Sequence, residues 1–183
     1  QSTSSPARAA AQTSSFTGRV TECAQLGDAV SRPGLVTVIG PGGVGKSRLA
    51  ARVAATPADL PGGRLWVSLG QVFEDVLVAS TVALTLGVQL PTDDAASAVA
   101  RFLAPLGRTL LVLDGCEVAL DGVASLVALL VAECPLLTVV TTSRVPLRLD
   151  GEVLLQLEPL PEPASDELPV LQANPLVRLL LDR

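Results

Sequence analysis

Histidine is absent from this sequence of 183 residues, and so is methionine. Without histidine, imidazole catalysis and the common zinc sites are hard to build. The cysteines are an odd number, lie far apart and show no Cys-x-x-Cys spacing, so we interpret Cys23, Cys116 and Cys134 as reduced packing residues of a cytoplasmic protein. The missing initiator methionine and the lack of a signal-peptide pattern indicate a piece of a longer protein.

Charged residues are scarce as well, at 17% of the chain, and the formal net charge is −5 with a pI near 4.7. Because gripping nucleic-acid phosphates needs clustered lysine and arginine, we expect no direct nucleic-acid binding by this domain. Long hydrophobic runs are missing too. The longest nearly apolar stretches, Val76 to Leu90 and Val123 to Ala132, fall short of the roughly 18 residues that span a membrane, so we expect no membrane segment.

The chain has enough hydrophobic residues to form one core. Hydrophobic residues make up 49% of the sequence and the mean hydropathy is +0.50, which excludes disorder for the bulk of the chain. Residues 1–15 are rich in Ser, Thr, Ala and Gln and predict a linker from an upstream domain. We expect the folded domain at 16–161. Residues 162–183 are expected to form an acidic Pro-rich turn and the start of a following helical region.

Apolar runs and helical spacings alternate along the domain. Short aliphatic runs predict strands at 35–39, 64–69, 109–113 and 137–141, with a weaker fifth at 153–157. Helical spacing predicts helices at 20–30, 46–55, 73–86, 95–103 and 120–132, and another near Pro175. Strands of unbroken aliphatics that alternate with helices indicate an α/β fold, with a parallel sheet covered on both faces.

Some individual residues are expected in the core. The first helix should turn one apolar face inward, made of Val20, Cys23, Ala24, Gly27 and Val30. Trp66 and Phe73 are also expected to pack in the interior.

A phosphate-binding loop joins the first expected strand to the second expected helix. The segment Gly40-Pro41-Gly42-Gly43-Val44-Gly45-Lys46-Ser47 fits GxxxxGK[ST], and it lies where the mechanism requires, between strand and helix. Its glycines let backbone N–H groups turn towards phosphates, and the helix N-terminus adds a positive dipole end. Lys46, the only lysine in the chain, would reach the β and γ phosphates, and Ser47 would hold Mg²⁺. The alternative is a Gly-rich turn without a ligand.

A phosphate-binding loop also needs an acidic residue at the end of a hydrophobic strand. The aliphatic run 110–113 ends in Asp114, where a carboxylate can reach Mg²⁺ through water; the alternative is an Asp that starts a turn with Gly115. Many related ATPases have an acid directly after this Asp to orient the attacking water, but here that position is Gly115. Glu117 is therefore the nearest candidate for catalysis, with a solvated Glu at a helix start as the alternative.

Two arginines are further candidates. Arg144 ends the segment Thr141-Thr142-Ser143-Arg144 after the fourth strand, on the side where open α/β sheets bind ligands. It is a candidate sensor of the γ phosphate, and a surface ion pair with Asp or Glu is the alternative. Arg19 precedes the first strand and could lie near the base of a nucleotide, although its spacing alone favours an ordinary surface position.

Several segments, taken in order, resemble one known family. They are Phe16-Thr17-Gly18-Arg19-Val20-Thr21-Glu22, the phosphate loop with Arg48-Leu49-Ala50, Leu111-Val112-Leu113-Asp114-Gly115-Cys116-Glu117, Cys134-Pro135 and Thr141-Thr142-Ser143-Arg144-Val145-Pro146-Leu147. From about Phe16 to Pro161 the chain resembles the AP-ATPase or NB-ARC-like signal-transduction ATPases, the STAND class, in the branch found in large bacterial transcriptional regulators.

The resemblance implies a P-loop NTPase sandwich of three layers, with strand order 2-3-4-1-5 and helices on both faces. It also implies a switch driven by ADP and ATP. In that switch the phosphate loop, with Arg48, and Asp114 bind Mg-nucleotide, Arg144 reads the γ phosphate, and Arg19 contributes to the adenine side. The chain departs from the family at Gly115, where this branch usually has Asn, and at Val118, which replaces a frequent His. Binding therefore follows from the resemblance more directly than hydrolysis does.

The sequence thus predicts an ATP- and ADP-binding switch domain of a cytoplasmic multidomain protein, a transcriptional regulator, with weak ATP hydrolysis. Its expected partners are an adenine nucleotide and other domains of the same polypeptide, and oligomerisation in the ATP-bound state is one further expectation. ATP is favoured over GTP because Ras-like GTPases read guanine with Asn-Lys-x-Asp, and the only lysine already lies in the phosphate loop. Two alternatives stay open: a small-molecule P-loop kinase with Arg101 and Arg108 in a lid, and a nucleotide-binding scaffold without turnover.

Overall fold

The computed structural model describes residues 18–56, 58–89 and 94–160. The expected linker, Phe16 and Thr17, the Pro-rich turn from 161 onwards and the helix near Pro175 lie outside the described residues.

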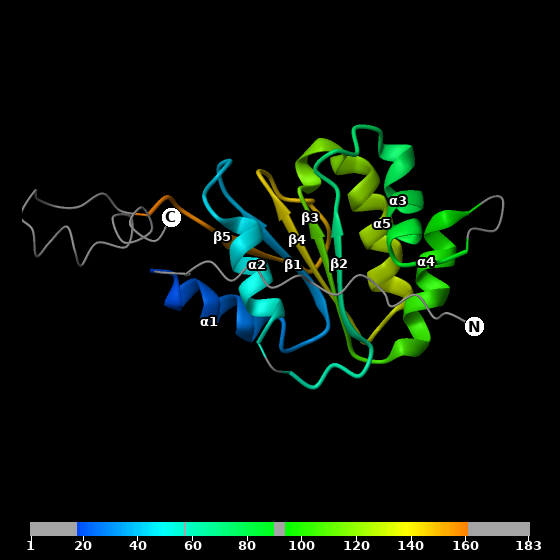
Figure 1. The fold of residues 1–183 in the computed structure, drawn as a ribbon, viewed down its shortest axis with the longest axis horizontal. Coiled ribbons are helices and arrows are strands. Elements are labelled where there is room, and N and C mark those ends of the chain that lie inside the picture. Colours follow the sequence, from blue (N-terminus) through cyan, green and yellow to red (C-terminus); the bar gives the residue numbers. More distant parts are fainter. Residues whose placement is uncertain (1–17, 57, 90–93, 161–183) are drawn as a thin grey trace, which may run out of the picture.

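Five parallel strands form one sheet in the order β2-β3-β4-β1-β5 (Figure 1). They are β1 (Gly34–Ile39), β2 (Gly63–Ser68), β3 (Thr109–Asp114), β4 (Leu137–Ser143) and β5 (Glu152–Gln156). Every strand lies within two residues of the run that predicted it, and the order is the one that the resemblance implied. The α/β fold class and the strand order are confirmed.

In the part of the chain that the structure describes, five α-helices cover the sheet: α1 (Val20–Ala29), α2 (Lys46–Ala54), α3 (Val78–Thr85), α4 (Ala95–Leu103) and α5 (Leu120–Glu133). Short 3-10 turns precede α3 (η1, Asp75–Leu77), follow α4 (η2, Ala104–Leu106) and precede α5 (η3, Cys116–Val118). Within the described ranges, no helix is both long and apolar enough to cross a membrane.

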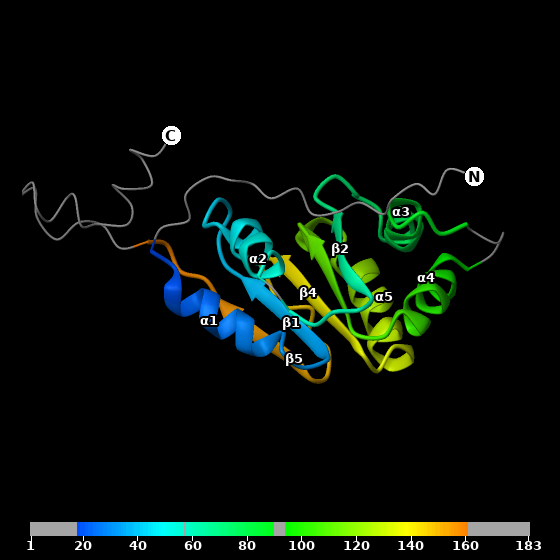
Figure 2. The same cartoon turned by 60° about the horizontal axis from the view of Figure 1, so that its bottom comes forward.

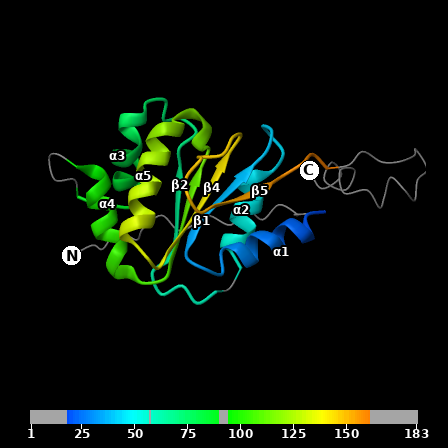
Figure 3. The same ribbon diagram turned by 180° about the vertical axis from the view of Figure 1, so that it is seen from behind.

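The two faces of the sheet carry different helices because side chains along each strand alternate between faces. On β3, Leu110 and Val112 belong to one core cluster with α1 and α2, whereas Leu111 and Leu113 belong to another with α3, α4 and α5. These layers can be followed in the tilted view (Figure 2) and from behind (Figure 3). Alternate side chains of the central strand β3 therefore face the two helix layers, and this gives the sandwich its three layers.

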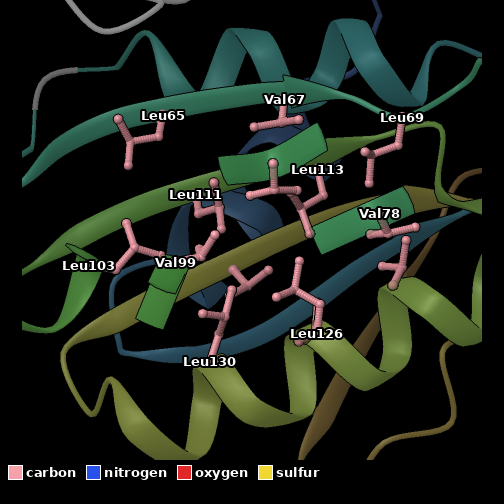
Figure 4. Close-up of a cluster of buried hydrophobic side chains, with 14 of the residues drawn as sticks. Leu65, Val67, Leu69, Val78, Val99, Leu103, Leu111, Leu113, Leu126 and Leu130 are labelled. Atoms are coloured by element: carbon pink, nitrogen blue, oxygen red, sulfur yellow. The ribbon is translucent and has the colours of Figure 1, made fainter. Parts of the chain in front are cut away.

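The larger core lies between the sheet and the layer of α3, α4 and α5 (Figure 4). Fully buried side chains from β2 and β3 meet α4 and α5 there, among them Val67, Leu111, Val99, Leu126 and Leu130. Burying one such side chain stabilises the fold by about 1.5–3 kcal/mol. This packing fixes the carboxyl ends of β3 and β4, where the candidate site lies.

Two sequence predictions about the interior are wrong. On α1 the predicted face is right for Cys23 and Val30, which pack against the smaller core, and wrong for Val20, which is 83% exposed. The one fully buried side chain of the helix is Leu26. Phe73 is 75% exposed, because it lies in the connection between β2 and η1 that crosses the start of α5, where Asp75 Oδ1 accepts a hydrogen bond of 2.7 Å from the Gly122 amide. Regular helix in this region starts at Val78, not at Phe73. Trp66 is half-buried against the smaller core.

Candidate phosphate-binding site

The phosphate loop, residues 40–47, leads from β1 directly into α2. Gly43 and Gly45 have φ angles of 75° and 102°, in the left-handed region that glycine adopts without strain. Gly45 is also the residue that precedes the first turn of α2. The glycines therefore allow the tight turn that aims backbone N–H groups at an anion in front of a helix N-terminus.

Lys46 is the first residue of α2, and its side chain folds back over the loop. Its Nζ donates hydrogen bonds of 2.9 Å to the carbonyl oxygens of both Gly40 and Pro41, and the residue is only 8% exposed. The only lysine of the chain thus places a positive charge inside the turn of the loop.

Ser47 and Asp114 meet across the site from different parts of the chain. Ser47 Oγ donates a hydrogen bond of 2.5 Å to Asp114 Oδ1, so the second residue of α2 touches the last residue of β3. Ser47 is exposed and Asp114 is half-buried. The two residues that the sequence assigned to metal binding therefore lie side by side.

This donor set fits Mg²⁺. A hydroxyl and a carboxylate are hard oxygen ligands, and Mg²⁺ is usually held by one or two such protein groups together with water and substrate phosphates. Among the described residues there is no cluster of three or more His, Cys, Asp or Glu side chains that could hold an ion without a nucleotide. Ser47 and Asp114 would hold the ion together with phosphate oxygens.

Arg144 and Glu117 form an ion pair at the same end of the sheet. Arg144 Nε lies 3.4 Å from Glu117 Oε1, and the side chains are 64% and 24% exposed. Glu117 Oε2 is buried and accepts no hydrogen bond within the described part of the chain. The guanidinium also borders the phosphate loop, because a Cβ added at Gly42 would lie 3.4 Å from Arg144 Nη2. The ion pair that the sequence analysis gave as the alternative role of Arg144 is therefore present, and it lies beside the place expected for phosphates.

The turn after Asp114 is crowded at Gly115. Its φ is 80°, and an added Cβ would lie 2.9 Å from both Cα and N of Gly70. Asn tolerates the left-handed conformation, but its side chain would need the backbone at Gly70 to move. The close approach of the chain after β2 thus favours glycine at this position.

Arg19 is buried at 6% exposure, so the expectation of an ordinary surface position is wrong. One guanidinium nitrogen donates to Glu22 Oε1 at 2.9 Å and another to the carbonyl oxygen of Val44 at 3.1 Å. The start of α1 is thereby tied to the phosphate loop. Spacing could not reveal this, because the contact joins residues 25 positions apart. Arg48 is half-buried in the first turn of α2.

Thr142, which the sequence did not single out, also contacts the site. It is 1% exposed and bonds to both Asp114 and Gly115. The polar segment at the end of β4 was visible in the sequence, but only the hydrogen bond between β4 and β3 shows that Thr142 is the residue that faces Asp114.

A cavity of about 560 Å³ lies at the other end of the strands, between the last turns of α1 and α2. Two of the arginines that line it form hydrogen bonds to backbone carbonyl oxygens of the chain. Arg108 donates to the carbonyl oxygen of Ser31 at 2.6 Å, and Arg64 donates to that of Thr56 at 3.0 Å. The cavity is separate from the phosphate loop. Arg108 precedes β3 and Asp114 ends it, so Arg108 is not placed to form a lid over the loop.

Proteins of known sequence resemble the chain over most of its length. It is 41% identical over 120 residues to the Mycobacterium tuberculosis protein named "Putative HTH-type transcriptional regulator Rv0890c", a match that covers 65% of this chain and 13% of that protein. It is 37% identical over 149 residues to "Uncharacterized protein Rv0894" of the same species, covering 80% of this chain and 37% of that protein. The chain thus spans a small part of these relatives. No model of a known protein family matches it.

Solved structures share the fold at low sequence identity. A STAND protein with a tetratricopeptide repeat sensor from Pyrococcus horikoshii matches 80% of this chain and 24% of its own, with a TM-score of 0.59 and 18% identity. Cdc6p from Pyrobaculum aerophilum matches 92% of this chain and 51% of its own, with a TM-score of 0.61 and 15% identity. At these identities the matches show a shared fold.

Proposed function

Since this chain has a P-loop NTPase fold like that of a STAND protein and is homologous to part of a protein named as a putative HTH-type transcriptional regulator, we propose that it binds ATP and ADP with Mg²⁺ as a regulatory switch. The observation that carries the proposal is the meeting of Lys46, Ser47 and Asp114 at one end of the sheet. The ammonium lies over the loop, and the hydroxyl lies 2.5 Å from the carboxylate oxygen. A Gly-rich turn without a ligand would need none of these groups.

Each residue of the site has a task in binding. Backbone N–H groups of the loop hold phosphate oxygens, and Lys46 exchanges the carbonyl oxygens of Gly40 and Pro41 for phosphate oxygens of higher charge. Ser47 and Asp114 would hold Mg²⁺, which would neutralise phosphate charge. Arg19 fixes the loop from the side of α1 and contributes to the adenine side of the site.

Arg144 and Glu117 supply the switch. Arg144 is 64% exposed, and a γ phosphate carries more charge than a carboxylate, so Arg144 can leave Glu117 for that phosphate. A γ phosphate thus releases the carboxylate of Glu117, which can then orient a water molecule. ADP lacks that phosphate and leaves the pair closed. Hydrolysis is slow because the position after Asp114 carries no acid.

The wider role of the protein follows from its relatives. A relative is named as an HTH-type transcriptional regulator, and we propose that this domain controls a transcriptional regulator in the cytoplasm. Because the chain has a net charge of −5, DNA binding belongs to another domain of that polypeptide. The nucleotide state would be passed on to those domains.

The experiment is a calorimetric titration of nucleotide-stripped protein with Mg-ATP, Mg-ADP and Mg-GTP. We expect measurable binding of both adenine nucleotides and at least about tenfold weaker binding of Mg-GTP, a difference of ~1.4 kcal/mol. Equal affinity for guanine would refute the adenine assignment. Arg144→Ala should weaken Mg-ATP binding and leave Mg-ADP binding unchanged, and equal losses for both would refute the γ-phosphate role of this arginine.

A further inference from the structure

We propose that Thr142 is a positioning residue that fixes the Asp114 carboxylate for metal binding. This inference rests on the proposed function, since it concerns the same site. It starts from a side chain that is 1% exposed at the end of β4, next to the carboxyl end of β3.

The direction of each hydrogen bond of Thr142 is determined. The Gly115 amide lies 2.9 Å from Thr142 Oγ1, and an amide can only donate. Asp114 Oδ1 lies 2.6 Å from the same Oγ1, and a carboxylate can only accept. The hydroxyl of Thr142 therefore accepts a hydrogen bond from the Gly115 amide and donates one to Asp114 Oδ1.

Two hydroxyls converge on one carboxylate oxygen. Asp114 Oδ1 accepts from Thr142 at 2.6 Å on one side and from Ser47 at 2.5 Å on the other. No hydrogen bond reaches Asp114 Oδ2 within the described residues. The carboxylate is thus held in one orientation by Oδ1, and Oδ2 stays available to a water molecule on the metal.

The contribution of Thr142 differs from that of Ser47. Ser47 is exposed and is itself an expected metal ligand, so its bond to Asp114 changes when it takes part in metal binding. Thr142 is buried and bonded to the backbone of Gly115, so it keeps its place. Thr142 is the fixed support, and it connects the metal-binding Asp114 to the strand that leads into Arg144.

The chain offers a matched set of variants. Thr142→Val removes the hydroxyl and keeps the shape of the side chain, whereas Thr142→Ser keeps the hydroxyl. Thr141→Val removes the neighbouring buried hydroxyl, which lies 2.7 Å from Thr37 Oγ1 on β1 and makes no bond to Asp114. Both valine variants lose a buried hydrogen bond of β4, but only Thr142→Val loses one to the candidate metal ligand.

The test compares ATP affinity with Mg²⁺ and with EDTA for the wild type and these variants. We expect Thr142→Val to lose about tenfold in affinity with Mg²⁺, the size of one hydrogen bond to a charged group, and nothing in EDTA. Thr142→Ser and Thr141→Val should behave like the wild type in both conditions. Equal losses in both conditions, or the same loss in Thr141→Val, would show that Thr142 only stabilises the fold and would overturn the inference.

A second measurement does not need nucleotide. The Gly115 amide should exchange its hydrogen faster in Thr142→Val than in the wild type or Thr142→Ser, and unchanged exchange would overturn the inference. If the wild type binds Mg-ATP and Thr142→Val keeps the full Mg²⁺ dependence, the role of Thr142 is refuted and the proposed function is not. If wild type binds no nucleotide, the proposed function falls, and the metal role of Thr142 falls with it.

Discussion

Arg144 Nε lies 3.4 Å from Glu117 Oε1, so the arginine assigned to the γ phosphate and the carboxylate assigned to the attacking water are paired with each other. The pair bridges the turn after β3 and the turn after β4. Because the arginine is mostly exposed, it can exchange Glu117 for a partner of higher charge. In the proposed function, this ion pair would link the nucleotide state to the position of the catalytic candidate.

Glu117→Gln tests the catalytic half of this pair. The amide keeps the size of the side chain but cannot act as a general base, whose contribution is about 100-fold or more. We expect an ATPase rate lowered by about that factor and an Mg-ATP affinity within twofold of wild type. Single-turnover kinetics at saturating protein would separate the two quantities. An unaltered rate would move the catalytic role to another residue.

Asp114→Asn tests the metal site. The substitution removes the negative charge that accepts hydrogen bonds from Ser47 and Thr142, and an amide is a weaker partner for Mg²⁺. We expect about a tenfold loss of ATP affinity with Mg²⁺ and little change in EDTA, by calorimetric titration. Equal losses in the two conditions would remove Asp114 from metal binding.

Arg19→Ala tests the connection between α1 and the phosphate loop. It deletes a buried guanidinium that bonds to Glu22 and to the Val44 carbonyl oxygen, and it leaves both without that partner. We expect the free energy of unfolding to fall by about 1–3 kcal/mol in urea titrations. The control is Arg101→Ala on the exposed side of α4, which should change it by less than ~0.5 kcal/mol. A similar small effect for Arg19 would contradict the structural role.

Gly115→Ala tests the crowded turn after Asp114. Its added Cβ would lie 2.9 Å from the backbone of Gly70 at a φ of 80°, so we expect a loss of stability of about 1–3 kcal/mol. Gly27→Ala is the matched control, because that helical glycine has open space around it. It should stabilise the protein by about 0.5–1 kcal/mol. Thermal unfolding of both variants measures the difference, and equal effects would show that the turn is not crowded.

Local patterns in the sequence predicted most of the elements and the main features of the site. Continuous aliphatic runs predicted the strands because a parallel sheet is buried on both faces, and the motif placed Lys46 and Ser47 at the start of α2. The strand order came from the resemblance, since alternation along the chain does not reveal which strands are neighbours. Asp114 was predicted from its place at the end of an aliphatic run.

The errors concern contacts between distant residues. Arg19 was expected at the surface because nothing in its neighbourhood shows that the first turn of α1 lies against Val44. Phe73 was expected in the core because it is apolar, but the helices leave the connection after β2 uncovered. Thr142 was missed because its partners, Asp114 and Gly115, belong to another strand and its turn. Such contacts depend on register and packing, which a single sequence does not encode locally.

The most direct test of nucleotide binding is the Mg-ATP affinity of Lys46→Ala beside that of the wild type. The wild type should bind Mg-ATP, and the variant should lose at least about 30-fold, which corresponds to ~2 kcal/mol for the contacts of one charged group. Arg101→Ala, which removes a positive charge from another part of the surface, should retain wild-type affinity, and circular dichroism should show all three proteins folded. Equal affinity of folded Lys46→Ala and wild type, or no binding by either, would contradict the account.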